Sequence, residues 1–412
     1  MTALARADFE ALDRTDPLRH FRDRFALPDG VIYLDGNSLG AMPKAALARL
    51  HQVAEIEWGR DLIRSWTKHG WIDLQERVGA KIGWLIGARP GETIVADSTS
   101  VNLFKLLAAA LRLRPESRVI LSEEGNFPND LYIAQGLASF LGSHELRLVA
   151  ADRLEAALGP DVAVVMLTQV DYRTGRMHDM KAVTRKVHES GALMLWDLCH
   201  SAGALPVDLT DANADFAVGC GYKYLNGGPG APAFLHIAER WHDQVTPPLT
   251  GWLGHAAPFD FETFYRPAEG IRRAVIGTPP VLSLAALEIG VDLLLEAPMA
   301  ELRAKSLHQF DLFAALVEQE LAAWAFRIVT PREHTNRGSQ ISLAHDQGWP
   351  IMQALIGHNV IGDFRARDIM RFGLTPLYLS YAEIWDAVAV LKEIMATDAW
   401  DRPEFHVRAK VT

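Results

Sequence analysis

The chain has 412 residues, 49% of them apolar and 22% charged, and its formal net charge is −10. This composition is typical of a globular protein and excludes a largely disordered chain, while the length suggests two domains. The negative charge disfavours a surface that binds nucleic-acid phosphates. Cys199 and Cys220 are the only cysteines, too few for a disulfide framework or a four-thiolate metal site.

No apolar stretch reaches the roughly 18 residues that a membrane span needs. Arg6, Asp8 and Glu10 lie where a signal peptide would be apolar. We therefore expect a cytoplasmic protein with a small-molecule substrate, no metal site, and neither nucleic acid nor membrane as a partner.

Short apolar runs alternate with longer amphipathic stretches along the chain. This alternation predicts an α/β fold with a mainly parallel sheet that is covered by helices on both faces. Ligands of such sheets bind at the carboxyl ends of the strands. The expected strands are "TIVA" (93–96), "RVIL" (118–121), "VAVVML" (162–167), "ALMLW" (192–196), "ADFAVG" (214–219) and "APAFLHI" (231–237).

Three segments are expected as domains. An N-terminal arm (1–45) contains the strand "VIYL" and the turn-rich "DGNSLG", and packs with the small domain. A large cofactor-binding domain (46–280) ends in a stretch rich in Pro and Gly. A smaller α+β C-terminal domain (281–412) is predicted from helical patterns at 281–296, 299–323 and 382–396 and from the candidate strands "QISLA", "NVIGDF" and "MRFGL".

Asp197 directly follows the expected strand "ALMLW", and Lys223 follows the next expected strand among tyrosines and glycines. Alone, a strand-end Asp is usually a helix cap or a turn, and a Lys in a Gly-rich turn is usually solvated. Together they form the arrangement that holds pyridoxal phosphate, in which Asp contacts the pyridine nitrogen and Lys binds the aldehyde carbon. A partly desolvated Lys is also a better nucleophile.

A phosphate needs backbone N–H donors at a helix N-terminus. "ADSTS" (96–100) lies between an expected strand and an expected helix, although Ser and Thr also cap ordinary helices. Phe127, in "NFPND", is either a ring that stacks on the cofactor or an ordinary buried aromatic. His200, three residues after Asp197, supports that acid, faces the cofactor ring, or is structural.

Seven stretches, in this order, resemble the kynureninase family of pyridoxal-phosphate enzymes, which have the aspartate-aminotransferase (type I) fold with a seven-stranded type of sheet. They are "YLDGNSLG" (33–40), "DSTSVNLFK" (97–105), "FPND" (127–130), "WDLCHSAGALPVDL" (196–209), "GCGYKYLNGGPGAPAF" (219–234), "GWLGH" (251–255) and "MRFGLTPLY" (370–378). An Asp-x-x-His motif followed by Lys occurs across the wider class-V aminotransferase group.

The resemblance implies a role for each matching residue. Lys223 binds the cofactor covalently, Asp197 pairs with its ring nitrogen, and Arg371 holds the substrate α-carboxylate as a bidentate fork; its alternative is a surface salt bridge. Thr278, which lies where some relatives have Asn, is implied as a further contact of the cofactor phosphate. The other implied contacts are Thr99 and Ser100 with the phosphate, Phe127 with the ring face, Asp130, Thr168 and His200 with the cofactor, Tyr222 and a partner subunit's Trp252 with the phosphate, and Trp66 and His69 with the aromatic end of the substrate.

The implied reaction is hydrolysis of the Cβ–Cγ bond of L-kynurenine to anthranilate and L-alanine in tryptophan degradation. Lys223 and Tyr222 are the expected acid and base, and a homodimer that prefers the unhydroxylated substrate is expected.

Three alternatives are open. A cysteine desulfurase or related lyase needs a nucleophilic Cys in the C-terminal part, and none follows Cys220. An aminotransferase needs the same Asp, Lys and Arg. A catalytically silent binding protein is disfavoured by the presence of both Lys223 and Asp197.

Overall fold

The computed structural model describes residues 4–408. By packing, the chain divides into two compact units, which we call the small unit (1–45, 172–177 and 296–412) and the sheet unit (46–171 and 178–295). Within the described residues, no helix is both long enough and apolar enough to cross a membrane.

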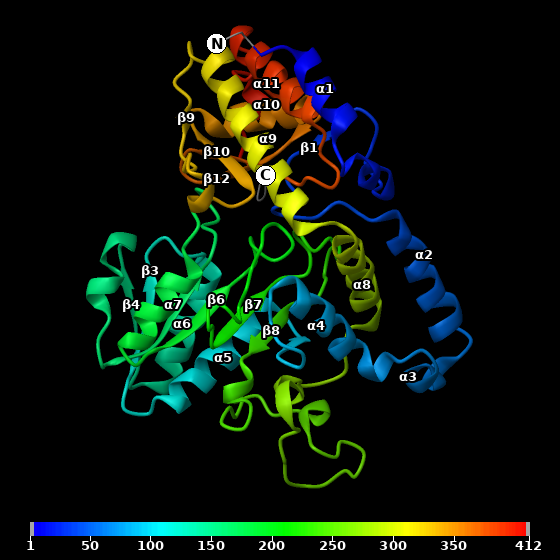
Figure 1. Cartoon of the computed structure of the whole chain (residues 1–412), viewed down its shortest axis with the longest axis vertical. Helices are drawn as coiled ribbons and strands as arrows, with labels where there is room; N and C mark the ends of the chain where they lie inside the picture. The colour runs from blue at the N-terminus through cyan, green and yellow to red at the C-terminus, as the bar shows by residue number, and fades with distance from the viewer. Residues whose placement is uncertain (1–3, 409–412) are drawn as a thin grey trace. The chain divides into compact units, whose positions relative to one another are not determined.

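A seven-stranded sheet forms the centre of the sheet unit, in the order β2-β8-β7-β6-β5-β3-β4 (Figure 1). The pairs β4–β3, β3–β5, β5–β6 and β6–β7 are parallel, whereas β8 is antiparallel to both β7 and β2. The mainly parallel sheet expected from the sequence is therefore confirmed. Its strands are β2 (Thr93–Val95), β3 (Val119–Glu123), β4 (Glu145–Val149), β5 (Val162–Thr168), β6 (Leu193–Asp197), β7 (Phe216–Gly219) and β8 (Phe234–Ile237).

The six expected apolar runs match all of these strands except β4. Strand β4 lies at the edge of the sheet and none of its residues is fully buried, so it lacks the continuous apolar run that marks β5 and β6.

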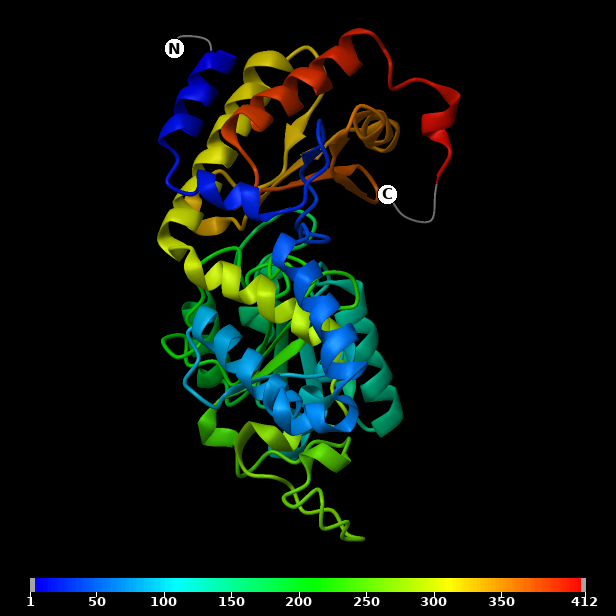
Figure 2. The same ribbon diagram turned by 90° about the vertical axis from the view of Figure 1, so that its right-hand side faces the viewer.

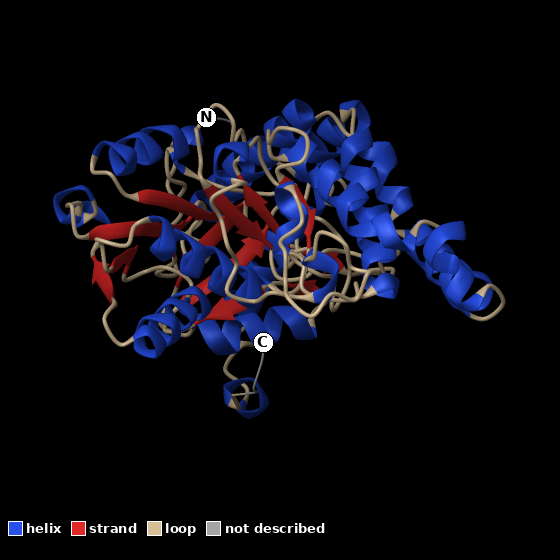
Figure 3. Ribbon diagram, turned by 90° about the horizontal axis from the view of Figure 1, so that it is seen from below, coloured by secondary structure: helices blue, strands red, loops and turns tan. Residues whose placement is uncertain are grey.

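Helices lie on both sides of the strands in the sheet unit (Figure 3). α5 packs on β5 and β7 and also contacts α6, and α7 packs on β6. The core between them is apolar and includes Met166, Leu195 and Phe216. The helices of this unit are α2 (Lys44–Gln52), α3 (Ser65–Lys68), α4 (Leu74–Leu85), α5 (Thr99–Leu113), α6 (Pro128–Leu141), α7 (Met180–Glu189) and α8 (Val281–Glu296).

The small unit contains a four-stranded sheet in the order β12-β13-β10-β9 and a parallel pair formed by β1 and β11. α9, α11 and α1 pack together around a core that includes Phe310, Phe313 and Phe372 (Figure 2). The elements are α1 (Arg6–Thr15), β1 (Ile32–Tyr33), α9 (Met299–Glu320), β9 (Arg327–Ile328), β10 (Gln340–Ala344), α10 (Gly348–Gly357), β11 (Val360–Ile361), β12 (Asp363–Arg365), β13 (Ile369–Gly373), α11 (Tyr381–Ala396) and α12 (Pro403–His406).

Two details of the small unit differ from the expectation. The run "NVIGDF" forms two short strands, β11 and β12, separated at Gly362. A Cβ at Gly362 would lie 2.8 Å from the carbonyl oxygen of Arg371, so only glycine fits at this break. Helix α10 and the two-residue strand β9 were not expected.

Helix α8 was expected to open the C-terminal domain, but by packing its residues up to 295 belong to the sheet unit. The reason is a close contact at Gly290, where a Cβ would lie 2.2 Å from the carbonyl oxygen of Leu225. The absence of a side chain lets α8 lie directly against the turn that follows Lys223. The functional domain boundaries stay a prediction.

Candidate active site

Two acids lie at the carboxyl end of the parallel strands. Asp197 is the last residue of β6, and the sheet register pairs it with Thr168 at the end of β5. It is 2% exposed, and its Oδ1 accepts a 2.7 Å hydrogen bond from the backbone N–H of Cys199. Asp130, from the first turn of α6, is equally buried, and burial together with the charge of Asp197 raises its pKa well above the ordinary value. Two negative charges are therefore disfavoured in this buried pair.

Lys223 lies in the turn between β7 and β8, surrounded by aromatic groups. Its Nζ is 3.1 Å from Nε2 of His200, 5.8 Å from the ring centroid of Phe127 and 5.9 Å from that of Tyr222. Burial raises the pKa of Tyr222 above the ordinary value, so its hydroxyl is protonated at neutral pH. The structure thus brings together four residues that sequence reasoning selected from three separate stretches.

The N-terminus of α5 forms the opposite end of the site. Ser98 caps the helix by accepting a hydrogen bond from the backbone N–H of Val101, which leaves the N–H groups of Thr99 and Ser100 without acceptors within the helix. The hydroxyl of Ser100 donates to Asn129 Oδ1 at 3.1 Å. Helix α5 has 15 residues, so the positive end of its dipole favours an anion here.

The negative charge of Asp97 would repel such an anion, and Lys105 neutralises the charge of Asp97. The ammonium of Lys105 is 2.7 Å from Asp97 Oδ2 and donates to the carbonyl of Ala274 at 2.8 Å. The Lys105 side chain is 1% exposed, and burial lowers its pKa. Sequence reasoning treated "DSTSVNLFK" as a motif but missed this pair, although the spacing of eight residues along a strand–helix turn was visible.

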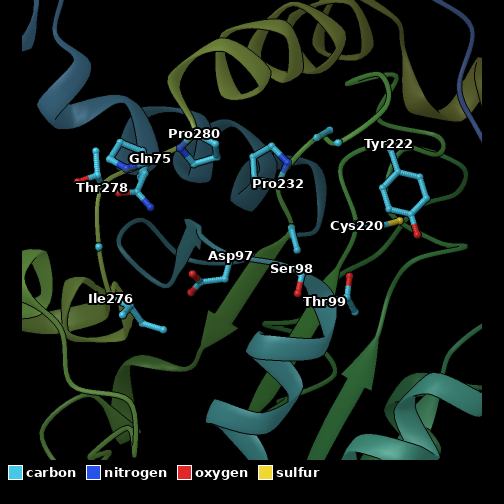
Figure 4. A pocket seen from close by; sticks show the side chains of 15 residues that line it. Gln75, Asp97, Ser98, Thr99, Cys220, Tyr222, Pro232, Ile276, Thr278 and Pro280 are labelled. Carbon is cyan, nitrogen blue, oxygen red and sulfur yellow. The ribbon is translucent and has the colours of Figure 1, made fainter.

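A cavity of about 620 Å³ lies at the N-terminus of α5, and Asp97, Ser98, Thr99 and Tyr222 are among the residues that line it. Figure 4 shows Ser98 and Thr99 at the start of α5, Tyr222 and Cys220 beside them, and Thr278 and Ile276 on the other side of the cavity. Thr99, Tyr222 and Thr278 are therefore predicted site residues that line one cavity. Its size is in the range of cavities that hold a cofactor or drug-sized ligand.

The residues fit pyridoxal phosphate. Asp197 and Asp130 form a buried pair of acids at the carboxyl end of the sheet, and burial with the charge of Asp197 raises the pKa of Asp130. A protonated ring nitrogen would supply a hydrogen-bond donor to the buried Asp197 carboxyl. The helix N-terminus at Thr99 suits the phosphate, and Phe127 offers a ring face.

Three other predicted residues have contacts of their own. Thr168 donates its hydroxyl to Asn126. Nε2 of His69 is 2.7 Å from Asp61 Oδ2, and Trp66 meets Trp71 edge to face at 6.0 Å between centroids. These contacts hold α3 to its neighbours, and a role for Trp66 and His69 toward the substrate stays a prediction.

Trp252 lies on an exposed loop of the sheet unit. Its ring stacks on Phe261 at 6.3 Å and meets Phe259 edge to face at 5.5 Å. The three side chains are 47%, 76% and 59% exposed, in the order Trp252, Phe261, Phe259. A monomer rarely exposes a contiguous aromatic patch of this kind without an interaction partner.

In the small unit, Arg371 is a buried residue of β13 with 1% exposure, which rules out the alternative of a surface salt bridge. Its Nε donates to Asp363 Oδ1 at 2.6 Å, and its Nη2 donates to Asp363 Oδ2 and, at 3.0 Å, to the hydroxyl of Ser38. Nη1 donates to the carbonyl of Tyr172 at 2.6 Å.

These contacts occupy most of the donors of Arg371, and a bidentate fork toward the substrate stays a prediction. A guanidinium has five N–H donors, and the Nε–Nη2 edge of Arg371 already binds Asp363. One N–H on Nη1 remains for a ligand. Sequence reasoning missed Asp363, although its position in a strand adjacent to "MRFGL" suggested that it neighbours Arg371.

Comparison with known proteins agrees with the resemblance. Residues 302–391 match the family model described as "Kynureninase C-terminal domain". The chain is 54% identical to a curated kynureninase of Pseudomonas fluorescens over 413 aligned residues, covering 99% of each chain. It is also 54% identical to the kynureninase of Burkholderia pseudomallei (strain K96243), covering 98% of each chain.

Solved structures share the fold at low identity. The apo cysteine desulfurase of Thermococcus onnurineus NA1 superposes with a TM-score of 0.76 at 19% identity, over 92% of this chain and 98% of that one. A C-DES variant with glycine covalently linked to its PLP cofactor gives a TM-score of 0.76 at 18% identity, over 95% of this chain and 100% of that one. These structures establish the type I fold, and the full-length identities establish more: the chain belongs to the kynureninase family.

Proposed function

We propose that this chain hydrolyses the Cβ–Cγ bond of L-kynurenine to anthranilate and L-alanine, with Lys223, Asp197 and Tyr222 as its catalytic residues. The observation that carries this proposal is the grouping of side chains around Lys223. Lys223 lies among Phe127, Tyr222 and His200, the paired acids Asp130 and Asp197 lie at the strand ends, and Tyr222 lines a cavity together with the N-terminus of α5.

Pyridoxal phosphate supplies an electron sink that stabilises negative charge at the substrate Cα. For this the ring nitrogen must stay protonated, and a buried carboxylate at Asp197 favours that proton. Burial and the charge of Asp197 raise the pKa of Asp130, which disfavours a second negative charge in the pair. Thr99 and Ser100 would offer backbone N–H groups to the phosphate, and Phe127 would offer its ring to the face of the cofactor.

Two side chains can move protons during the reaction. With its amine free, Lys223 could accept the Cα proton, and His200 at 3.1 Å is positioned to orient its Nζ. Tyr222 keeps its proton at neutral pH because burial raises its pKa. Tyr222 is therefore the proposed proton donor for the step that releases anthranilate.

We also propose that Arg371 binds the substrate α-carboxylate through its remaining N–H. Asp363 and Ser38 fix the plane of the guanidinium, so the donor is held in one orientation before the substrate arrives. A preorganised charged donor of this kind favours substrates that carry a carboxylate at Cα.

A homodimer is the proposed assembly, with the aromatic cluster of Trp252, Phe259 and Phe261 as part of its interface. Large exposed aromatic side chains are enriched in protein interfaces and dominate their binding energy. In this arrangement Trp252 would approach the phosphate site of the partner subunit. A cytoplasmic location stays a prediction.

We also propose a preference for L-kynurenine over 3-hydroxykynurenine, as expected from the family resemblance. Comparing kcat/KM for the two substrates tests this preference.

The test of the activity is stoichiometry. The purified holoenzyme should release one anthranilate and one L-alanine for each L-kynurenine consumed, measured by anthranilate fluorescence and amino-acid analysis. Formation of a keto acid with an added amino acceptor, in place of anthranilate, would show an aminotransferase instead. Asp197→Ala should retain the fold and lose this activity, whereas an unchanged rate would remove the proposed role of Asp197.

A further inference from the structure

A cluster of charged groups surrounds Arg371 within the small unit. Asp363, which is 2% exposed, binds Arg371 and also forms a 2.7 Å ion pair with Arg365. The hydroxyl of Ser38 donates to Asp363 Oδ2 at 2.8 Å and accepts from Arg371. The site formed by these two guanidinium groups and one carboxylate therefore has a net charge of one positive unit.

Asp35, in the "DGNSLG" turn, is a second acid beside this cluster. Its backbone carbonyl accepts hydrogen bonds from the N–H groups of Ser38 and Leu39 at 2.9 and 3.0 Å, which fix the turn. The Oδ1 atom of Asp35 is buried and has no hydrogen-bond partner among the described residues. The carboxyl is therefore held next to the arginines without being bound by either of them through Oδ1.

The groups that face Asp35 come from three strands and the turn itself. They are Tyr33 of β1, Asp363 and Arg365 of β12, Arg371 of β13, and the hydroxyl of Ser38. Burial, followed by the charge of Asp363, raises the pKa of Asp35 to about 7, against the lowering effect of Ser38 and the two arginines. Its charge is therefore adjustable near neutral pH.

The charge balance of the cluster follows from this arrangement. With Asp35 neutral, Arg365, Arg371 and Asp363 sum to one positive charge, which matches one incoming carboxylate. With Asp35 ionised the sum is zero, and an added carboxylate leaves an uncompensated negative charge in a buried site, which is unfavourable.

We propose that Asp35 takes up a proton from solvent when a carboxylate binds at Arg371, so that carboxylate binding and protonation of Asp35 are thermodynamically coupled. The proposal rests on the proposed role of Arg371 and deepens it. The α-carboxylate forms its hydrogen bond with Nη1 of Arg371, a proton adds to the Asp35 carboxylate, and no other bond changes. The coupling is reciprocal: if carboxylate binding raises the proton affinity of Asp35 by some factor, ionisation of Asp35 lowers the affinity for the carboxylate by the same factor. Carboxylate binding should therefore weaken as the pH rises.

The test measures proton uptake by the holoenzyme when it binds L-alanine, the carboxylate product of the family reaction. Calorimetry in two buffers of different ionisation enthalpy gives the number of protons taken up. The proteins are wild type, Asp35→Asn, and Asp29→Asn as a matched control, because Asp29 is an exposed acid of the same arm. L-Alaninamide, which lacks the carboxylate, is the control ligand.

Near pH 7, wild type and Asp29→Asn should take up more protons with L-alanine than Asp35→Asn does, and the difference should vanish with L-alaninamide. The pH should be raised from two units below the pKa of Asp35 to two units above it. Over this range the ratio of the wild-type Kd to the Asp35→Asn Kd should rise about fivefold. Equal proton uptake and parallel pH profiles for wild type and Asp35→Asn would overturn the coupling.

Arg371→Met separates this coupling from the proposed function. If Arg371→Met binds L-alanine as well as wild type does, the role of Arg371 itself fails. If Arg371→Met weakens binding while Asp35→Asn leaves the pH profile unchanged, only the coupling fails. Should Asp35→Asn not fold, infrared difference spectra of wild type provide the readout, since L-alanine should increase the band of a protonated carboxylic acid and no increase would refute the proposal.

Discussion

Gly290 offers a sharp test of how the fold positions Lys223. A Cβ at this position of α8 would lie 2.2 Å from the carbonyl oxygen of Leu225 and 2.8 Å from the backbone of Asn226. Both atoms belong to backbone that cannot rotate away, so Gly290→Ala forces α8 and the turn after Lys223 apart.

Two opposing contributions decide the size of the effect. Ala in place of Gly within a helix stabilises by about 1 kcal/mol. Overpacking against rigid backbone costs about 3 kcal/mol. The net prediction is a loss of about 2 kcal/mol, which lowers Tm by about 4–8 °C. Because the turn holding Lys223 moves, cofactor affinity should fall as well.

Gly136 is the matched control, because it lies in α6 and a Cβ there would meet nothing within 4 Å. Gly136→Ala should gain about 1 kcal/mol and leave cofactor binding unchanged. Thermal unfolding of the two variants, with fluorescence titration of the cofactor, measures the contrast. The reasoning fails if Gly290→Ala is as stable as Gly136→Ala.

Further predictions concern the phosphate end, the interface and pH. Lys105→Met should weaken cofactor binding about thirtyfold, since an unneutralised Asp97 charge costs about 2 kcal/mol near the phosphate. A titration of the apoenzyme with the cofactor measures this loss, and the second substitution Asp97→Asn should restore the affinity. Trp252→Ala should raise the dimer dissociation constant about tenfold or more in analytical ultracentrifugation, and an unchanged constant would place the interface elsewhere. The pKa of Asp35 is raised from 3.8 to about 7 in the folded protein. Its contribution to stability is therefore complete below the unfolded pKa and is lost as the pH rises through the folded pKa. Asp35→Asn should therefore raise the free energy of unfolding by up to about 4 kcal/mol above pH 7 and change it little in acid, as denaturant melts at several pH values would show.

The sheet was predictable because its central strands are buried on both faces and therefore appear as continuous apolar runs. The same logic located Asp197 and Lys223, since a residue that follows a parallel strand lies at the carboxyl edge of the sheet. Strand β4 was missed because an exposed edge strand carries no such run.

The partners of the predicted residues were beyond the reach of sequence patterns. Asp363 and Ser38 meet Arg371 across β12, β13 and the N-terminal arm, and Ser38 is 333 residues away from Arg371. Such pairings depend on tertiary packing, and no local periodicity records them. The carboxylate of Asp363 beside Arg371 is visible only in the folded chain for this reason, and the way in which Arg371 meets the substrate stays a prediction.

The central claim is that Lys223 is the residue that binds the cofactor and enables C–C cleavage. Borohydride reduction of the holoenzyme followed by peptide mass spectrometry should find the cofactor on Lys223. Lys223→Ala should form no anthranilate. The control is Lys181→Ala, which removes an exposed lysine that pairs with Asp211 and should behave as wild type. Recovery of the cofactor on a different lysine, or wild-type anthranilate formation by Lys223→Ala, would contradict the account.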